Sequence, residues 1–288
     1  MTTVRLGGFD VLVNSLAAQT FSKEDWELII VDEWAEDRIP VVYGRVVSSG
    51  IKNSRIIPPR VTHAYIDDAT GYNTGLQVAH GELIIFLTDM IWCYPEFLAD
   101  HWYIYQSNPG KSLTGFLDRY APPAIKMPVD PAAMYWTVFE EEFTAARAEE
   151  YFAVTPVLYA ERKGLSFDHN GGLQTLPPDK FYAALNESIP MAVLKEINGW
   201  DERFNGGYGV NDIDLGMRAA LIGWEFLVDF KSINRKLGDQ SVLGKIPRKQ
   251  KARLRTPDDN YKLYLDHIQR IVEGKETVAV PPGHGCWA

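Results

Sequence analysis

Apolar residues along the chain follow two kinds of pattern, helical spacing and short continuous runs. Within residues 9–16 they recur at i, i+3, i+4 and i+7, which is typical of one buried face of a helix. Residues 27–32 and 82–89 form two continuous apolar runs, and each run ends in an aspartate. Uninterrupted runs of this length are typical of strands that are covered on both faces.

Further segments extend the alternation of helices and strands. The predicted elements are a helix at 70–80 capped by Gly81, a helix from Pro95 to about 107, a strand at 112–118, a helix at 131–152, a helix opened near Asp212 and closed by Gly223, and a strand at 224–229. The alternation predicts an α/β fold with a mostly parallel central sheet and helices on both faces. Because ligands bind beyond the carboxyl ends of such strands, we expect Asp32 and Asp89 on one rim.

Composition excludes several classes of protein. The 288 residues are 46% hydrophobic and 23% charged, which excludes disordered and fibrous chains. Cys93 and Cys286 are too few for a disulfide framework or a four-cysteine metal site. No apolar run approaches the roughly 20 residues of a membrane span, and no leader pattern opens the chain, so we expect a cytoplasmic protein. The net charge of −9 argues against a general nucleic-acid binder.

This charge is unevenly distributed. Residues 231–255 hold nine cationic side chains and one acid, a net charge of +8, which leaves −17 for the rest of the chain. A boundary near residue 230 is therefore expected, with a main domain at 1–230 and a basic extension at 231–288.

Carboxylates on loops are the main candidates for chemistry, because the fingerprints G-x-G-x-x-G, G-x-S-x-G, H-E-x-x-H and C-x-x-C are all absent. Asp32 can bind a nucleotide, or it can cap the following helix. Asp89 can bind a cation or a sugar hydroxyl. Asp212 and Asp214 can act on a substrate, or they can be first-turn acids that favour the helix dipole. Trp200 can stack on a sugar ring or belong to the core.

The ordered set of motifs resembles family 2 glycosyltransferases with the GT-A fold. The matching segments are Ser15-Leu-Ala-Ala-Gln-Thr-Phe21, Trp26-Glu-Leu-Ile-Ile-Val-Asp-Glu33, Asn73-Thr-Gly75, Ala79-His-Gly-Glu82, Phe86-Leu-Thr-Asp89, Pro95-Glu-Phe-Leu98, Asn186-Glu-Ser-Ile-Pro190, Gly199-Trp-Asp-Glu-Arg-Phe204 and Gly207-Tyr-Gly-Val-Asn-Asp-Ile-Asp-Leu215, with Arg218 and Gly223. They cover residues 10–230 in the family's order.

The resemblance implies an inverting transferase that uses a UDP-, GDP- or dTDP-linked sugar and an acceptor that the sequence does not identify. By motif position, the general base is Asp212. The resemblance further assigns a set of binding residues: Asp32, Asn73 and Asp89 for the donor, and Trp200, Asp201 and Glu202 for the acceptor side.

Departures from the family pattern concern the metal. The D-x-D region reads Thr88-Asp89-Met90-Ile91 here, with Met90 in place of a ligand. Asp89 is therefore the one carboxylate left for Mn²⁺ or Mg²⁺, which prefer oxygen ligands over a thioether. Tyr72 replaces a phosphate-binding arginine, and the first strand is shorter than in the family. One hypothesis is that the basic extension folds over the diphosphate and replaces the metal through Arg235, Lys236 and Arg248. The alternative is a flexible tail that binds an anionic acceptor or a membrane surface.

Two rival functions remain at this point. The loss of a carboxylate at Met90 would suit a catalytically silent module that binds sugar nucleotides or glycans. Retention of Asp212 and its glycine-rich loop weighs against that reading. A nucleotidyltransferase on a related sheet would need an early glycine-rich phosphate loop, which the sequence lacks.

Overall fold

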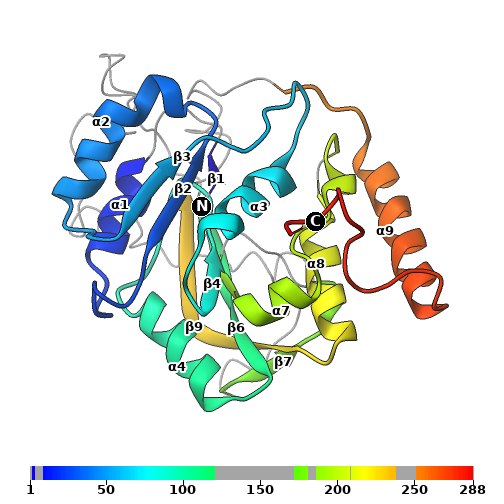
Figure 1. The fold of residues 1–288 in the computed structure, drawn as a ribbon. Coiled ribbons are helices and arrows are strands. Elements are labelled where there is room, and N and C mark those ends of the chain that lie inside the picture. Colours follow the sequence, from blue (N-terminus) through cyan, green and yellow to red (C-terminus); the bar gives the residue numbers. More distant parts are fainter. Residues whose placement is uncertain are drawn as a thin grey trace.

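The computed structural model describes residues 2–3, 9–120, 172–180, 186–207, 209–237 and 251–287. These residues form a mixed α/β arrangement in which helices surround a set of central strands (Figure 1). The predicted helix at 131–152 and the candidate Arg248 lie outside the described residues.

Most elements of the amino-terminal half match the predicted pattern. They are β1 Thr2–Thr3, α1 Phe9–Ala17, β2 Leu28–Asp32, α2 Ala35–Ser48, β3 Ser54–Ile57, α3 Asp68–Val78, β4 Leu83–Phe86, β5 Ile91–Trp92, α4 Phe97–Ser107 and β6 Lys111–Tyr120. The predicted helices at 9–16, 70–80 and 95–107 are confirmed within a few residues, as are the strands at 27–32 and 82–89.

The carboxyl-terminal half holds shorter elements and one long strand. They are β7 Gln174–Leu176, η2 Pro178–Lys180, β8 Glu187–Pro190, α7 Met191–Glu196, η3 Glu202–Phe204, α8 Asn211–Leu221, β9 Glu225–Leu237 and α9 Pro257–Val272. Residue 230 lies inside β9, so the sheet continues through the position at which the charge of the chain changes sign.

The strands form two sheets among the described residues. A three-stranded sheet has the order β1-β2-β3 and is parallel throughout. A larger sheet has the order β4-β8-β6-β9-β5, with β7 paired to β9.

The prediction of a mostly parallel sheet is wrong for the larger sheet. There β6 and β9 are parallel, whereas β4–β8, β6–β8, β5–β9 and β7–β9 are antiparallel. A continuous apolar run reports that a strand is covered on both faces, and it carries no information about the direction of the neighbouring strand.

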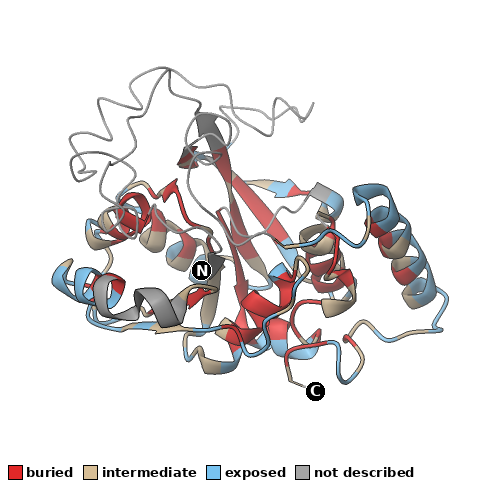
Figure 2. Cartoon of the chain, turned by 90° about the horizontal axis from the view of Figure 1, so that it is seen from above, coloured by how far each residue is buried: buried red, intermediate tan, exposed pale blue. Residues whose placement is uncertain are grey.

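The two faces of the strands pack into two separate cores. On β4, Phe86 and Ile84 contact the core that contains α3, α7 and α8, whereas Ile85 packs against the core that contains α1, α2 and α4. Leu28 and Ile30 of β2 belong to this second core. Figure 2 shows buried residues along the strands and exposed ones on the outer faces of helices such as α9. The prediction of helices on both faces is confirmed.

The capping prediction for Gly81 is wrong. Helix α3 ends at Val78, and its C-cap residue is Ala79 in an extended conformation. The backbone N–H groups of His80 and Gly81 both donate to Glu27 Oε1, at 2.6 and 3.2 Å. The Glu27 side chain, just before β2, therefore accepts both backbone hydrogen bonds of this turn. Local sequence rules do not predict a partner so far away along the chain.

A buried polar network supports the middle of the larger sheet. His101 of α4 places Nε2 2.9 Å from Asn186 Oδ1 and Nδ1 2.9 Å from Ser188 Oγ. Asn186 also donates to the carbonyl oxygen of Phe116, at 2.9 Å. Burial lowers the pKa of His101 to about 4, so this imidazole is neutral at physiological pH.

We expect Gly115→Ala to destabilise the protein by about 1–3 kcal/mol, because β6 shifts register between Gly115 and Phe116 and an added Cβ would overlap the Asn186 amide. Urea unfolding would measure the change. The matched control is Gly44→Ala on α2, where nothing lies within 4 Å of the added carbon. Equal unfolding midpoints for Gly115→Ala and the parent protein would contradict this expectation, because they would show that the Asn186 side chain moves aside without a loss of stability.

Candidate functional site

Asp212 lies in the first turn of α8, after a loop in which three of the described residues have left-handed backbone angles. Gly206, Gly209 and Val210 have φ angles of 88°, 84° and 73°. Glycine adopts such angles readily, but a β-branched residue is strained there. Val210 is buried against Tyr264 of α9, and this packing holds the strained position. The loop thus fixes where α8 starts and where Asp212 points.

The environment of Asp212 suits a proton acceptor. Its side chain is half-buried, and burial raises its pKa to about 6. The backbone N–H of Ile213 donates to Asp212 Oδ1 at 2.9 Å and opposes this rise, whereas the negative charge of Asp68 adds to it. A carboxylate with a pKa near 6 is mostly ionised at neutral pH, and it holds a proton more readily than an exposed aspartate.

Lys251 joins two carboxylates next to the end of β2. Its Nζ lies 2.8 Å from Glu33 Oε1 and also pairs with Asp67. All three side chains are almost fully buried. Burial alone would lower the pKa of Lys251, but hydrogen bonds to Asp67 and Glu33 raise it above its ordinary value. The lysine is therefore a fixed cation at this rim.

The residues that follow Lys251 tie the rim to the Asp212 loop. Ala252 accepts a hydrogen bond from the backbone of Ile66 at 3.1 Å, and Leu254 donates to the carbonyl oxygen of Gly206 at 2.7 Å. Residues 252–254 of the basic extension thus lie across the loop before α3 and the loop before α8.

Asp32 is fully buried at the carboxyl end of β2. Its Oδ1 accepts a hydrogen bond from the backbone N–H of Trp34 at 2.9 Å, just before α2 begins. This contact closes a turn before the helix, but it is not the helix cap that the sequence offered as one alternative, because the N-cap residue of α2 is Trp34 and no side chain caps this helix. Thr3 of β1 pairs with Asp32 in the parallel ladder.

Asp89 and the predicted cations Arg235 and Lys236 lie in neighbouring segments. The turn at Asp89 leads into β5, where Ile91 pairs with Lys236 and Trp92 pairs with Arg235. Antiparallel pairing places the end of β9 directly beside this turn. The structure therefore brings two of the three predicted cations to the Asp89 segment.

The residues around Asp89 do not fit a hard divalent cation. Met90 has a left-handed φ of 64°, and its side chain is fully buried. A thioether is a poor ligand for Mg²⁺ or Mn²⁺, which take several oxygen ligands. Asp89 is thus the single carboxylate that this turn supplies.

A second cluster consists of residues of the types that bind metals, and the protein's own arginines already pair with its carboxylates. Within the described residues, ligand atoms of Asp201, Asp214 and His267 lie within 4.8 Å of one another. Asp201 accepts from Arg203 Nε at 2.9 and 3.0 Å, and Asp214 accepts from Arg218 Nε at 2.7 Å. Because two guanidinium groups already compensate these carboxylates, the cluster does not fit a metal ion either.

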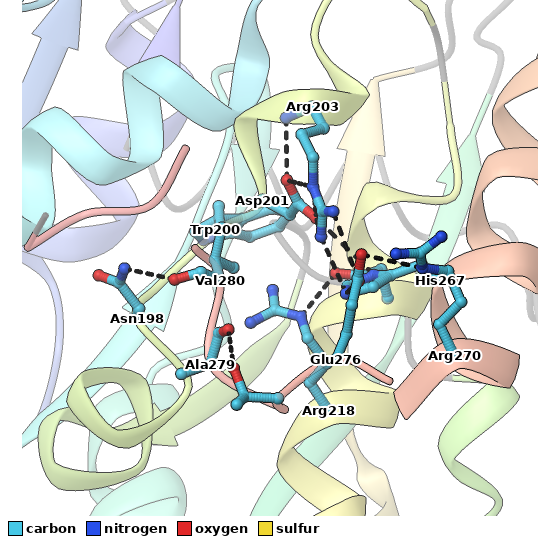
Figure 3. A network of polar contacts seen from close by, with 12 residues as sticks. Asn198, Trp200, Asp201, Arg203, Arg218, His267, Arg270, Glu276, Ala279 and Val280 are labelled. Atoms are coloured by element: carbon cyan, nitrogen blue, oxygen red, sulfur yellow. Dashed lines mark hydrogen bonds and ion pairs between the residues drawn. The ribbon is translucent and has the colours of Figure 1, made fainter. Parts of the chain in front are cut away.

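The same residues form a buried network that joins α8 to α9 (Figure 3). His267 Nδ1 lies 2.8 Å from Asp214 Oδ1, and Arg203 Nη2 lies 2.9 Å from His267 Nε2. Since arginine can only donate, Nε2 accepts and Nδ1 donates to Asp214. Glu276 completes the network through an ion pair with Arg203 at 3.5 Å.

Asp214 is ionised within this network. Burial alone would raise the pKa of Asp214, but the neighbouring Arg218 guanidinium and the hydrogen bond from His267 hold it below its ordinary value. Arg218 also donates to the carbonyl oxygens of Ile197 and Gly199, at 2.8 and 2.9 Å. Asp214 is two residues from Asp212, so the network anchors the turn that carries the candidate base.

Three of the predicted substrate-binding residues are joined by hydrogen bonds of Asn73, and two of them, Asn73 and Trp200, are buried. Asn73 donates to the carbonyl oxygen of Trp200 at 2.9 Å and to Glu202 Oε1 at 2.8 Å, and it accepts from Trp200 N at 2.9 Å. Trp200 is 1% exposed and stacks on Tyr72 with ring centroids 4.5 Å apart. Its ring belongs to the core, as the alternative reading of this tryptophan held.

Several residues of the site were not singled out from the sequence. Lys251 was only one of nine basic residues, and His267 was one of six scattered histidines. Asp67 and Asp68 form an acidic pair at the N-cap and first position of α3, and such a pair at a helix start could have been noticed. No local signal connects His267 to Asp214, which lies 53 residues earlier.

Comparison with known proteins gives a likeness in structure alone. No protein family and no curated protein matches the chain by sequence. Residues 1–349 of Staphylococcus aureus TarS, in complex with UDP-GlcNAc, match with a TM-score of 0.54 at 14% identity, over 93% of this chain and 66% of that one. The chain is similar in fold to TarS.

Two further TarS structures agree. Another structure of residues 1–349 matches with a TM-score of 0.52, and a longer TarS chain matches with 0.51, both at 15% identity over 82% of this chain. The match spans 58% of the shorter TarS chain and 35% of the longer one, so this chain corresponds to only part of TarS. At such identity the likeness to TarS concerns the fold. Separately, none of the helices in the described part of the chain is long and apolar enough to cross a membrane.

Proposed function

We propose that the protein is an inverting glycosyltransferase of the GT-A type, which moves a sugar from a nucleoside-diphosphate sugar to an acceptor hydroxyl. The observation that carries this proposal is the half-buried Asp212, with its pKa raised to about 6, at the start of α8. The fold match supports the donor class, because that TarS structure is a complex with UDP-GlcNAc.

The reaction is a single in-line displacement at the anomeric carbon. The acceptor oxygen attacks from the face opposite the diphosphate, and its bond to carbon forms as the carbon–phosphate-oxygen bond breaks, so the configuration inverts. Asp212 takes the acceptor proton, and the nucleoside diphosphate leaves with the electron pair. Alignment of the two substrates supplies much of the remaining acceleration.

The leaving diphosphate needs positive charge, and the chain offers its own. Arg235 and Lys236 lie beside the Asp89 turn, where the donor set does not fit Mg²⁺ or Mn²⁺. We assign the diphosphate to Arg235, the more exposed of the two cations, and the nucleoside to the rim at Asp32. Lys236 is buried and, as the next residue of β9, points to the opposite face. Arg248 stays a candidate from the sequence alone.

The acceptor side is assigned to the segment that contains Trp200, Asp201 and Glu202. In the described structure Asp201 and Trp200 are buried, so they shape this wall rather than contact the acceptor directly. The contacts of Ala252 and Leu254 support the idea that the extension at 231–288 belongs to the site.

A thermal-shift screen would test the proposed function. We expect one UDP-, GDP- or dTDP-linked sugar at about 100 times its Kd to stabilise the fold by ~2.7 kcal/mol, equally with Mn²⁺ and with excess EDTA. The corresponding sugar without its nucleotide is the control. If no nucleotide sugar raises the melting temperature, the assignment as a transferase is wrong. A shift that vanishes in EDTA would overturn the metal-free part. A shift without turnover on any acceptor would favour a silent binding module.

A further inference from the structure

The loop before Asp212, residues 203–210, directs backbone carbonyl oxygens toward the residues that begin α9. Among the described residues of this loop, the carbonyl oxygens that accept hydrogen bonds from residues 254–260 are those of Arg203, Phe204, Asn205, Gly206 and Gly209. A largely irregular loop has to find partners for its carbonyl groups outside itself. Here a single segment, far away along the chain, supplies the donors.

Arg255 holds the first half of the loop. Its Nη2 donates to the carbonyl oxygens of Arg203 and Asn205, at 2.5 and 2.6 Å. Its backbone N–H donates to the carbonyl oxygen of Gly206 at 3.0 Å, and the N–H of Leu254 donates to the same oxygen at 2.7 Å. Because a charged donor forms stronger hydrogen bonds than a neutral one, the guanidinium group is the main link between α9 and this part of the loop.

Asn260 completes the hold on the loop. Its side chain is 1% exposed, and Nδ2 donates to the carbonyl oxygens of Phe204 and Gly209, at 3.4 and 3.2 Å. A Cβ on Gly207 would lie 2.4 Å from the Asn260 amide, so the backbone of the loop passes directly against this side chain. Asn260 Oδ1 accepts a hydrogen bond from Arg255 Nε at 3.1 Å, which joins the two side chains into one unit.

The start of α9 fixes Arg255 and Asn260 relative to each other. Thr256 is the N-cap residue and forms a capping box with Asp259, whose backbone N–H donates to Thr256 Oγ1 at 3.2 Å. Arg255 directly precedes this box and Asn260 directly follows it. These two positions often hold a pair of apolar side chains that sets the direction of the chain. In this protein a hydrogen-bonded polar pair occupies them, and its remaining donors bind the loop.

The opposite side of the loop contacts the start of α3. The backbone N–H of Gly206 donates to the carbonyl oxygen of Ile66 at 2.5 Å, and Asn205 Nδ2 donates to Thr70 Oγ1 at 2.8 Å. Helix α9 also lies beside α8 (Figure 1). The loop is therefore held from two sides just before it leads into Asp212.

We propose that Arg255 and Asn260 are positioning residues, which clamp loop 203–210 so that the Asp212 carboxylate stays aligned with the acceptor hydroxyl. This inference rests on the proposed function, in which Asp212 is the general base. Val210 has a φ of 73°, and its carbonyl oxygen accepts the backbone N–H of Asp214 at 2.9 Å, so the path of the loop sets the first turn of α8. A displacement of ~1 Å at a reacting group can cost on the order of 10²-fold in rate.

Titration of the Asp212 carboxyl group tests the clamp without any substrate. NMR would follow its carboxyl carbon resonance against pH in the full chain, assigned through its loss in Asp212→Asn. Burial is the main cause that raises the pKa of this group to about 6. We expect Arg255→Met to release the loop, admit water and lower this pKa toward the ordinary aspartate value of about 3.9. In the transfer assay, kcat should fall on the order of 10²-fold, whereas KM for the donor should stay unchanged.

The direction of the change distinguishes position from charge. Loss of a cation alone would raise the pKa of Asp212, just as the negative charge of Asp68 raises it. A rise, or a pKa equal to that of the parent protein, would therefore overturn the proposal. The control is Lys262→Met, which removes an exposed cation from the same helix and should leave the titration and kcat unchanged.

Asn260→Ala is the second variant, and it decides the question if Arg255→Met does not fold. It removes the donors to the carbonyl oxygens of Phe204 and Gly209 without changing the net charge. The pKa of Asp212 and kcat should both fall, and parent-like values of both would show that the clamp does not exist. If the parent protein transfers no sugar and these variants still lower the pKa of Asp212, the proposed function is wrong and the clamp on the carboxylate stands.

Discussion

Replacing Asp212 with asparagine is expected to slow sugar transfer by a factor of ~10²–10⁴, the usual contribution of a positioned proton acceptor. Asparagine has almost the same shape, and its side-chain oxygen can still accept the hydrogen bond from the Ile213 backbone. Its amide cannot take the acceptor proton. The loss should therefore fall on kcat, whereas donor binding in a thermal-shift assay stays as in the parent protein.

The pH profile provides a second measurement on the same residue. With a pKa of about 6, Asp212 is the ionised, active base above that pH and the inactive acid below it. The rate should fall about tenfold for each pH unit below 6, and asparagine should abolish this limb. Asp266→Asn, on the exposed side of α9, is the matched control and should leave the profile unchanged. Full activity in Asp212→Asn would show that Asp212 is not the general base.

The sequence predicted the elements better than their arrangement. The apolar runs that became β2 and β4 and the helical spacing of α1 depend on local burial, which a sequence pattern reports directly. Strand direction depends on partners far along the chain. β4 pairs with β8, about a hundred residues later, and the run 83–86 gives no indication of it.

The prediction of the candidate site from the sequence was limited in the same way. Asp212 was identified through its motif and the glycine-rich loop before it, which is local information. The tertiary partners that define its surroundings, such as Lys251 against Glu33 and His267 against Asp214, join segments that no short pattern connects. The role of Trp200 was ambiguous for a related reason. The sequence around an aromatic residue in a loop does not show whether its ring is buried in the core or exposed at a binding surface.

Arg218→Met is expected to destabilise the fold by about 3–5 kcal/mol, because it leaves the Asp214 carboxylate buried without its main compensating charge. Both side chains of this pair have no exposed surface. Methionine also removes the donors to two backbone carbonyl oxygens, those of Ile197 and Gly199. A loss of this size is a large fraction of the ~5–15 kcal/mol that stabilises a typical protein. Urea unfolding at neutral pH would measure it.

The pH dependence distinguishes this cause from a simple packing defect. The lowered pKa of Asp214 stabilises the parent fold above the ordinary aspartate range, and this contribution is lost as the pH falls through the folded-state value. Without Arg218, burial favours the protonated acid, so the deficit of the variant should shrink as the pH falls below about 4. Lys52→Met, which breaks an exposed pair with Glu24, is the control and should cost less than about 1 kcal/mol at any pH. A deficit that stays constant with pH would show that Arg218 acts through packing, and the anchoring of the α8 turn would then not depend on its charge.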